Sequence, residues 1–461
     1  MRLLPALLFL SAGLSAAGSP PNVVLIMTDD QGWADISAQG KGVRTPNLDR
    51  LGAEGIRMTS FYATQAVCTS SRAALLTGCY PNRIGLGGNA LGPNSPIGIN
   101  PQEQTLAELL KARGYRTGIS GKWHLGDKPA FLPPRHGFDE SLILPYSNDM
   151  WPLGHDPRHP RPSYPLLRWI EAGVTGEVVG TWDDMDKVTA RQFDWAEAFV
   201  RRHAGKDQPF FLYIAPSMPH TPLGRSAAHK GKGPTPYAEV ISEIDERVGR
   251  LLELLRQTGA DNNTLVIYTS DNGPWLNFGD HAGSAGPFRE GKGTTWEGGV
   301  RVPFLARWPA VIKPGRVSPA LAANLDILPT VVAATGAKSP ELPIDGLSFL
   351  PLLRGESETA RDAFTYYYAG DNPQAIRKGR WKLHLPHTSR SYEGIKPGVD
   401  GEGGPTRQKK IELSLYDLEK DPGERTDVSA QHPEVVEELK TLAAKSKQEL
   451  LAGKRAPGRV K

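Results

Sequence analysis

The residues best suited to chemistry lie where a loop leads into a helix-forming segment. Cys68-Thr69-Ser70-Ser71-Arg72 runs directly into the apolar residues 73–76. Small hydroxyl residues before an apolar run are typical of a helix N-terminus, where unpaired backbone N–H groups favour negative charge. Arg72 lies one helical turn after Cys68 on the same face, so its guanidinium can reach back toward whatever Cys68 carries. The pattern predicts a site that handles an anion.

Two plainer interpretations apply to the same residues. One is a small buried cysteine beside an ordinary surface arginine. The other is a disulfide between Cys68 and Cys79, the only two cysteines of the chain, which would block chemistry at Cys68. The residues alone leave these alternatives open.

Carboxylates follow two runs that predict buried strands. Residues 22–28 are apolar and end in Asp29-Asp30, and residues 264–269 are followed by Ser270, Asp271 and Asn272. Adjacent carboxylates are costly unless they are solvated or neutralised by a cation. Both a solvated turn and a ligand site at the edge of a sheet fit this pattern.

Basic residues follow two further predicted strands. Residues 114–119 lead into Lys122 and His124, and residues 209–215 lead to His220. Because parallel strands end at the same edge of a sheet, these side chains and the carboxylates should converge on one pocket. Taken singly, each histidine is more typical of a structural role than of a catalytic one.

The elements that position these residues predict an α/β fold. Apolar periodicity predicts helices over residues 46–52, 103–113, 188–203 and 237–257. Helices alternating with strands favour a large, mainly parallel sheet covered on both faces. The loop at 146–165 has no clear period, and we expect it to lie over the pocket mouth. Its Asp149, His155, Arg158 and His159 are candidate specificity residues.

From about residue 365 the pattern changes to short strands between turns. These strands are expected at residues 366–368, 380–385 and 413–417, before a helix over residues 433–450. We predict a catalytic domain at residues 20–360. A subdomain at residues 361–461 combines a small antiparallel sheet, one helix and a basic tail that we expect to be disordered.

Composition narrows the class of protein. The 461 residues include 54 Lys and Arg against 50 Asp and Glu, a net charge of +4 that is too small and too evenly spread to indicate nucleic-acid binding. Residues 1–17 combine Arg2, an apolar run and small residues, which predicts a secretory signal peptide. No apolar run is long enough to predict stable membrane insertion. An exported chain with two cysteines fits a bacterial periplasmic or secreted enzyme better than a lysosomal one.

Two segments resemble a known family. Cys68, Ser70 and Arg72, with Pro81, Arg83 and Gly85 after them, resemble the signature of the type I, formylglycine-dependent sulfatases. The glycine-rich residues 291–303 resemble the second conserved block of that family, in which the lysine binds substrate sulfate. The amino-acid sequence of this block, and that of residues 271–274, most resembles the branch of arylsulfatase A and N-acetylgalactosamine-6-sulfatase.

The resemblance implies an alkaline-phosphatase-like fold and a defined set of site residues. The cysteine of the signature is oxidised after translation to formylglycine by a maturation enzyme. One divalent cation is implied, and an all-oxygen shell on irregular loops favours Ca²⁺ over Mg²⁺. The metal ligands would be Asp29, Asp30, the modified Cys68, Asp271 and Asn272. The catalytic residues would be Cys68, Arg72, Lys122, His124, His220 and Lys292. Substrate would be bound by Lys122, Ser147, His220 and Lys292.

The family mechanism explains these residue types. One hydroxyl of hydrated formylglycine attacks sulfur to give a covalent sulfate ester, and deprotonation of the other expels sulfate. Reach and pKa suggest His124 as the base of the second step and His220 or Lys292 as the proton donor to the leaving oxygen. The implied substrates are sulfate monoesters of aryl alcohols or carbohydrates.

Two other functions remain as alternatives. A phosphate or phosphonate monoester hydrolase of the same superfamily would share the tetrahedral substrate geometry, and a second metal set would favour phosphate. An inactive carbohydrate-binding homologue would keep the fold without turnover. Specificity is expected to depend on the loops at residues 146–165 and 275–289.

Overall fold

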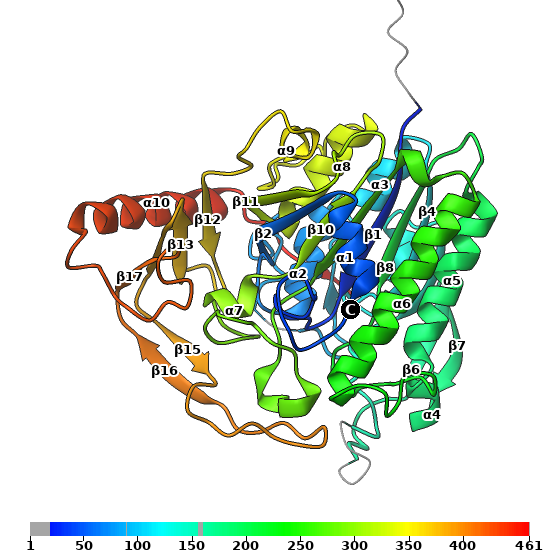
Figure 1. Ribbon diagram of the computed structural model, residues 1–461, viewed down its shortest axis with the longest axis horizontal. Helices are drawn as coiled ribbons and strands as arrows, with labels where there is room; N and C mark the ends of the chain where they lie inside the picture. Colours follow the sequence, from blue (N-terminus) through cyan, green and yellow to red (C-terminus); the bar gives the residue numbers. More distant parts are fainter. Residues whose placement is uncertain (1–18, 89, 155–159, 461) are drawn as a thin grey trace, which may run out of the picture.

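A ten-stranded mixed sheet runs through the larger part of this computed structural model, which describes residues 19–88, 90–154 and 160–460 (Figure 1). Its strand order is β11-β2-β10-β9-β1-β8-β4-β5-β6-β7, and the five strands from β9 to β5 are parallel. The strands span Asn22–Thr28 (β1), Ile56–Tyr62 (β2), Arg116–Lys122 (β4), Glu140–Leu144 (β5), Leu167–Glu171 (β6), Val174–Val179 (β7), Phe210–Ala215 (β8), Thr264–Ser270 (β9), Phe304–Arg307 (β10) and Arg316–Ala323 (β11).

Successive side chains of β1 point to opposite faces of the sheet, and both faces are covered. Val23, Leu25 and Met27 belong to one hydrophobic cluster, whereas Val24 and Ile26 belong to another. All five side chains are fully buried, as the continuous apolar run predicts for a central parallel strand.

Helices form a layer against each face of the sheet (Figure 1). One layer contains α1 (Pro46–Ala53), α5 (Val188–His203) and α6 (Pro236–Gln257). The other contains α2 (Cys68–Thr77), α3 (Leu106–Ala112), α8 (Ile327–Thr335) and α9 (Leu350–Arg354). The short helices α4 (Trp182–Met185) and α7 (Glu297–Val300) lie in connecting segments. The predicted α/β architecture, a large, mainly parallel sheet between helices, is confirmed.

The C-terminal part forms a smaller body beside the large sheet (Figure 1). Its four antiparallel strands are β12 (Ala363–Tyr366), β13 (Ala375–Lys378), β14 (Trp381–His384) and β17 (Ser414–Asp417). The helix α10 (Pro433–Ala452) packs on this sheet, as predicted. A separate hairpin, β15 (His387–Ser391) with β16 (Arg407–Ile411), extends from it.

Several predicted boundaries differ from the structure by one to three residues, and the strand expected to end at residue 119 continues to Lys122 as β4. The helix expected from residue 103 begins at Leu106, because Thr105 and Glu108 form a reciprocal capping box that fixes the first turn. The strand expected at residues 366–368 is β12, which ends at Tyr366, where pairing with Ala375 ends. Tyr368 therefore leaves the sheet.

The predicted disorder of the basic tail is wrong. Arg455 forms an ion pair with Glu103, 2.6 Å between Nε and Oε1, and Glu103 is almost fully buried. Further on, β18 (Gly458–Arg459) pairs with β3 (Ile97–Gly98) of the large body. These specific contacts outweigh the polar composition on which the prediction of disorder depended.

Ending the chain after Gly453 is expected to lower the free energy of unfolding by about 2 to 4 kcal/mol, because it leaves the Glu103 carboxylate buried without its cation. Urea unfolding of the purified protein measures the change. The control is Lys454→Gln, which removes an exposed ion pair with Asp371 and is expected to cost less than about 1 kcal/mol. A truncated chain as stable as the full one would contradict the docking of the tail.

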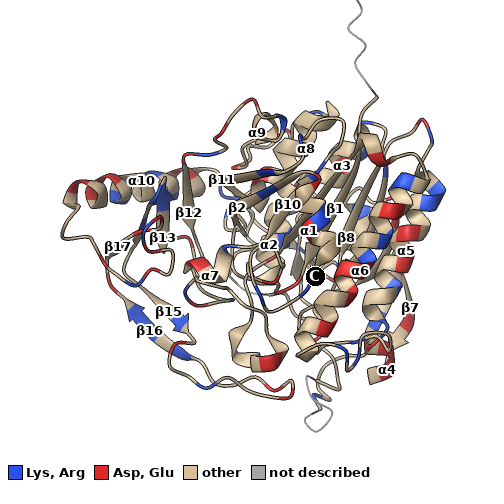
Figure 2. Ribbon diagram, viewed as in Figure 1, with Lys and Arg blue, Asp and Glu red and all other residues tan. Residues whose placement is uncertain are grey.

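The described residues include no helix with the length and apolar composition needed to cross a membrane. The predicted signal peptide, residues 1–17, lies outside the described ranges. Acidic and basic side chains alternate along α5, α6 and α10, whereas the β15–β16 hairpin is mainly basic (Figure 2).

Candidate active site

Cys68 is the first residue of α2, so the predicted helix N-terminus is confirmed. Val67 before it has an extended backbone, and the Ser71 N–H donates to the Val67 carbonyl at 3.0 Å. Cys68 is 2% exposed, and both cysteines are free, which excludes the Cys68–Cys79 disulfide. Burial raises the pKa of the Cys68 thiol, although Lys122 and Lys292 oppose the shift. The unmodified thiol is therefore protonated and a poor nucleophile.

Four oxygen-bearing side chains meet where β1 and β9 end side by side. Thr28 and Ser270 are register partners, so the residues after them, Asp29-Asp30 and Asp271-Asn272, come together. The Asp30 N–H donates to Asp271 Oδ1 at 3.1 Å, and Asn272 Nδ2 donates to Asp30 Oδ1 at 2.7 Å. All four residues are buried, which excludes a pair of solvated turn aspartates.

Each of the three carboxylates has its own cation. Lys122 Nζ lies 2.5 Å from Asp29 Oδ2, and Lys292 Nζ lies 2.7 Å from Asp30 Oδ1. Arg72 Nη2 lies 2.8 Å from Asp271 Oδ2 and 3.5 Å from Asp29 Oδ2. Arg72 is fully buried, so the surface-arginine interpretation is wrong, and its fork contacts carboxylates.

The electrostatics of this cluster favour a divalent cation. Burial opposes ionisation of Asp29, but Lys122, His220, Arg72 and Lys292 together hold its pKa well below the usual range. Burial and the nearby charge of Asp29 raise the pKa of Asp271. Asp29 and Asp271 repel each other when both are ionised, so a bound cation would stabilise the ionised pair.

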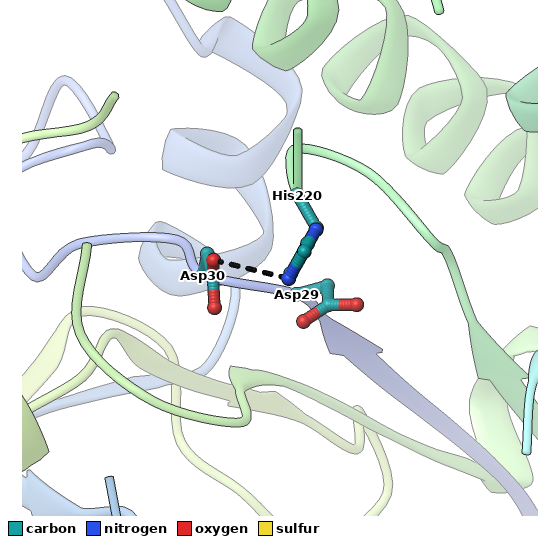
Figure 3. Close-up of side chains that lie close together, drawn as sticks. All are labelled: Asp29, Asp30 and His220. Carbon is teal, nitrogen blue, oxygen red and sulfur yellow. Dashed lines mark ion pairs between the residues drawn. The ribbon is translucent and has the colours of Figure 1, made fainter. Parts of the chain in front are cut away.

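Both predicted histidines lie at this cluster, and their hydrogen bonds indicate which ring nitrogen is protonated. His220 Nε2 lies 3.6 Å from Asp30 Oδ2 (Figure 3), while Nδ1 lies 2.5 Å from the Thr221 carbonyl. His124 Nε2 lies 2.9 Å from the Leu91 carbonyl, and Nδ1 is buried without a hydrogen-bond partner among the described residues. Because a carbonyl only accepts, the proton is on His220 Nδ1 and on His124 Nε2.

Burial lowers the pKa of both histidines, with Lys292 acting on His220 and Lys122 on His124. Both rings are therefore neutral at pH 7, and each retains one nitrogen lone pair that can accept a proton. For His124 that lone pair is on Nδ1.

A cavity of about 210 Å³ opens beside Cys68. Ser147 lines it and links two site residues, since Lys122 Nζ donates to Ser147 Oγ at 3.1 Å and His220 Nε2 lies 3.5 Å from the same oxygen. The lining residues are Ala66, Val67, Cys68, Gly88, Ala90, His124, Ser147, Asp149, Met150, His220, Trp275, Lys292, Tyr368 and Arg390.

The structure thus brings together all eleven site residues that the sequence suggested. Of the candidate specificity residues, Asp149 lines the cavity, and His155, Arg158 and His159 lie outside the described residues. Sequence reasoning missed Tyr368 and Arg390, which come from the C-terminal body. No sequence motif marks them. They reach the cavity through the docking of that body against the large sheet, which the sequence does not show.

The donors at the ends of β1 and β9 fit a divalent cation. Asp29 Oδ1 and Asn272 Oδ1 are buried, and the described residues offer neither oxygen a hydrogen-bond donor. Asp29 also lies within 4.8 Å of ligand atoms of Cys68 and Asp271 in one group, and of Asp30 and His220 in another. Both groups contain Asp29, so within the described residues they outline one site, and its carboxylate and amide oxygens suit a hard ion.

Comparisons with known sequences agree with this geometry. The family described as "Sulfatase" matches residues 21–337, "C-terminal region of aryl-sulfatase" matches residues 360–460, and "N-sulphoglucosamine sulphohydrolase, C-terminal" matches residues 290–390. Arylsulfatase A of Homo sapiens is 40% identical, over 95% of this chain and 89% of its own length.

Two further relatives extend the comparison. N-acetylgalactosamine-6-sulfatase of Canis lupus familiaris is 38% identical, over 94% of this chain and 86% of its own length. The crystal structure of PsFucS1 sulfatase from Pseudoalteromonas sp. superposes with a TM-score of 0.85 at 28% identity, covering 95% of this chain and 92% of that one. The similarity therefore extends over both the large body and the C-terminal body.

Proposed function

This chain belongs to the sulfatase family, whose members are sulfuric ester hydrolases with a formylglycine mechanism, and we propose that it cleaves sulfate monoesters of saccharides in the cavity beside Cys68. The observation that carries the proposal is the placement of Cys68 at a helix N-terminus, beside three buried cation–carboxylate pairs. The relative named N-acetylgalactosamine-6-sulfatase supports a saccharide, and the relative named Arylsulfatase A supports an aryl sulfate as the alternative.

Two groups complete the proposed site. Asp29, Asp30, Asp271 and Asn272 would hold a divalent cation, for which we propose Ca²⁺, together with the modified side chain at position 68. Formylglycine at position 68, made by a separate maturation enzyme, supplies the nucleophilic hydroxyl, and the cation supplies positive charge to the sulfate oxygens.

The chain's own residues bind the anion and move protons. Lys122, Lys292 and the N–H groups at the start of α2 neutralise the developing charge on the sulfate. Ser147 and His220 orient the ester. Lys292 donates a proton to the leaving oxygen, or His220 does so after its Nε2 has taken one up. The free Nδ1 lone pair of His124 accepts a proton in the second step. Arg72 holds Asp271 and Asp29 in place through charge-assisted hydrogen bonds.

The location and the domain boundary belong to the same proposal. The segment at residues 1–17 would direct the chain out of the cytoplasm, into the periplasm or the medium of a bacterium. Residues 20–360 would form the catalytic domain, and residues 361–461 would form a wall of the cleft.

Turnover of a chromogenic aryl sulfate by protein co-expressed with a formylglycine-generating enzyme tests the proposal. We expect sulfate release that a chelator lowers at least about 100-fold, because the sulfate oxygens lose the positive charge that the bound cation would supply. Calcium should restore the rate better than magnesium.

Three results would count against the proposal. Phosphate monoester cleavage in preference to sulfate would favour the phosphatase alternative. No turnover of any ester, despite an aldehyde at position 68, would favour a binding protein. A rate that does not respond to chelation would remove the cation from the mechanism.

A further inference from the structure

The cavity wall contains an arginine that the proposed mechanism does not use. Arg390 belongs to β15 and lines the cavity together with Tyr368 and Lys292. Its guanidinium lies against Gly293, where an added Cβ would come within 2.8 Å of Arg390 Nη1. Gly293 directly follows Lys292, so Arg390 lies next to the chain segment that carries the proposed sulfate-binding lysine.

Arg390 differs from the other cations of the site in its partners. Lys122, Lys292 and Arg72 each contact a carboxylate, whereas no carboxylate of the described residues lies within 4.0 Å of Arg390. Its hydrogen-bond partner is the Tyr392 hydroxyl, at 3.5 Å. Burial lowers the pKa of Arg390, but the phenols of Tyr392 and Tyr368 more than offset this and raise it.

The carboxylate nearest to Arg390 along the chain is already paired with other cations. Arg289, Lys409 and Arg425 all form ion pairs with Glu393, which lies three residues after Arg390. The hairpin as a whole is basic (Figure 2). Arg390 is therefore a half-buried cation in the cavity wall, and the carboxylate of Glu393 does not neutralise its charge.

The segment after Arg390 is fixed to the loop that carries Lys292. The Tyr392 hydroxyl donates to the Lys292 carbonyl at 2.6 Å. Glu290 accepts from the Ser391 hydroxyl at 2.6 Å and from the Tyr392 N–H at 2.7 Å. These bonds hold Arg390 and Lys292 at a set separation before any ligand arrives, which lowers the entropy cost of binding two anionic groups together.

We propose that Arg390 binds a second anionic group of the substrate, so that the preferred substrate is a sulfated saccharide with an additional carboxylate or sulfate. This inference rests on the proposed function, because it takes the sulfate beside Cys68 as the first anion. The planar guanidinium matches the oxygens of either group bidentately. A uronate carboxylate and a second sulfate ester are the two sources of that chemistry.

Matched substrates distinguish these sources. One pair is N-acetylgalactosamine 6-sulfate and its 4,6-disulfate. The other is a disaccharide of 6-sulfated N-acetylgalactosamine and a uronate, compared with its uronate methyl ester. For each pair, kcat/KM of the doubly charged substrate is divided by that of its partner, for the wild type and for Arg390→Gln.

We expect Arg390→Gln to lower this ratio by about 10- to 100-fold for one of the pairs, chiefly through KM, because it removes a charge-assisted contact. Arg390→Lys should restore part of the ratio, since it keeps the charge and loses the fork. Lys410→Gln is the matched control, because Lys410 is exposed on β16 and does not line the cavity. Unfolding midpoints confirm that each variant is folded.

The outcomes separate the two proposals. A wild type that cleaves sulfate esters while Arg390→Gln leaves both ratios unchanged overturns the role of Arg390 and leaves the proposed function intact. A wild type that cleaves no sulfate ester overturns both. If the ratio falls equally in Lys410→Gln, the effect comes from the general charge of the hairpin. This outcome also overturns the role of Arg390.

Discussion

The Cys68→Ala variant is expected to lower kcat for an aryl sulfate by at least about 10⁴-fold, because it removes the precursor of the proposed nucleophile. Cys68 is buried at the first position of α2, and burial raises the pKa of its thiol. The side chain is therefore suited to be a precursor rather than a thiolate nucleophile. Cys68→Ser should transfer sulfate at most once, since one hydroxyl cannot both hold the sulfur and expel it.

The second cysteine provides a matched control for this experiment. Cys79 follows the other end of α2, roughly 15 Å along the helix from Cys68. Its Sγ accepts from Arg455 Nη2 at 3.2 Å, away from the cavity. Cys79→Ser should keep the wild-type kcat, and the mass of the tryptic peptide at residues 58–72 should show an aldehyde in both this variant and the wild type. Full activity of Cys68→Ala would refute the role of position 68.

The fold and most of the site were predictable because they depend on local signals. The apolar run before Asp29 indicates a central strand, and a strand of that kind ends at the ligand-binding edge of an α/β sheet. Lys122 ends a strand of the same type, and His220 and Asp271 follow two more, so all three reach the same edge. Four such strands therefore suffice to place the site before its exact geometry is known.

The parts that were missed depend on contacts distant in sequence. Arg390 reaches the cavity only because the hairpin is bonded to the loop around Glu290, about a hundred residues earlier. The tail was expected to be disordered because its polar composition carries no sign of Glu103, which lies 352 residues earlier. Composition describes a segment in isolation, whereas order at these positions comes from single buried partners elsewhere in the chain.

The Arg72→Met variant is expected to be both less stable and less active, because it leaves the buried carboxylate of Asp271 without its cation. Arg72 and Asp271 are fully buried and 2.8 Å apart, so breaking the pair should lower the free energy of unfolding by about 3 to 5 kcal/mol, as measured by urea unfolding in the presence of chelator. We expect kcat to fall about 100-fold, since Asp271 and Asp29, the proposed metal ligands, are no longer held in place.

Two matched variants show which property of Arg72 matters. Arg72→Lys keeps the charge but loses the fork that contacts both Asp271 and Asp29, so it should recover more stability than kcat. Arg50→Met removes a long pair with Glu54, 3.9 Å apart, between two partly exposed side chains, and should change stability by less than about 0.5 kcal/mol. If Arg72→Met lowered the free energy of unfolding no more than Arg50→Met does, the three cation–carboxylate pairs would not act as one network. The electrostatic reason for proposing a shared ion site would then fail.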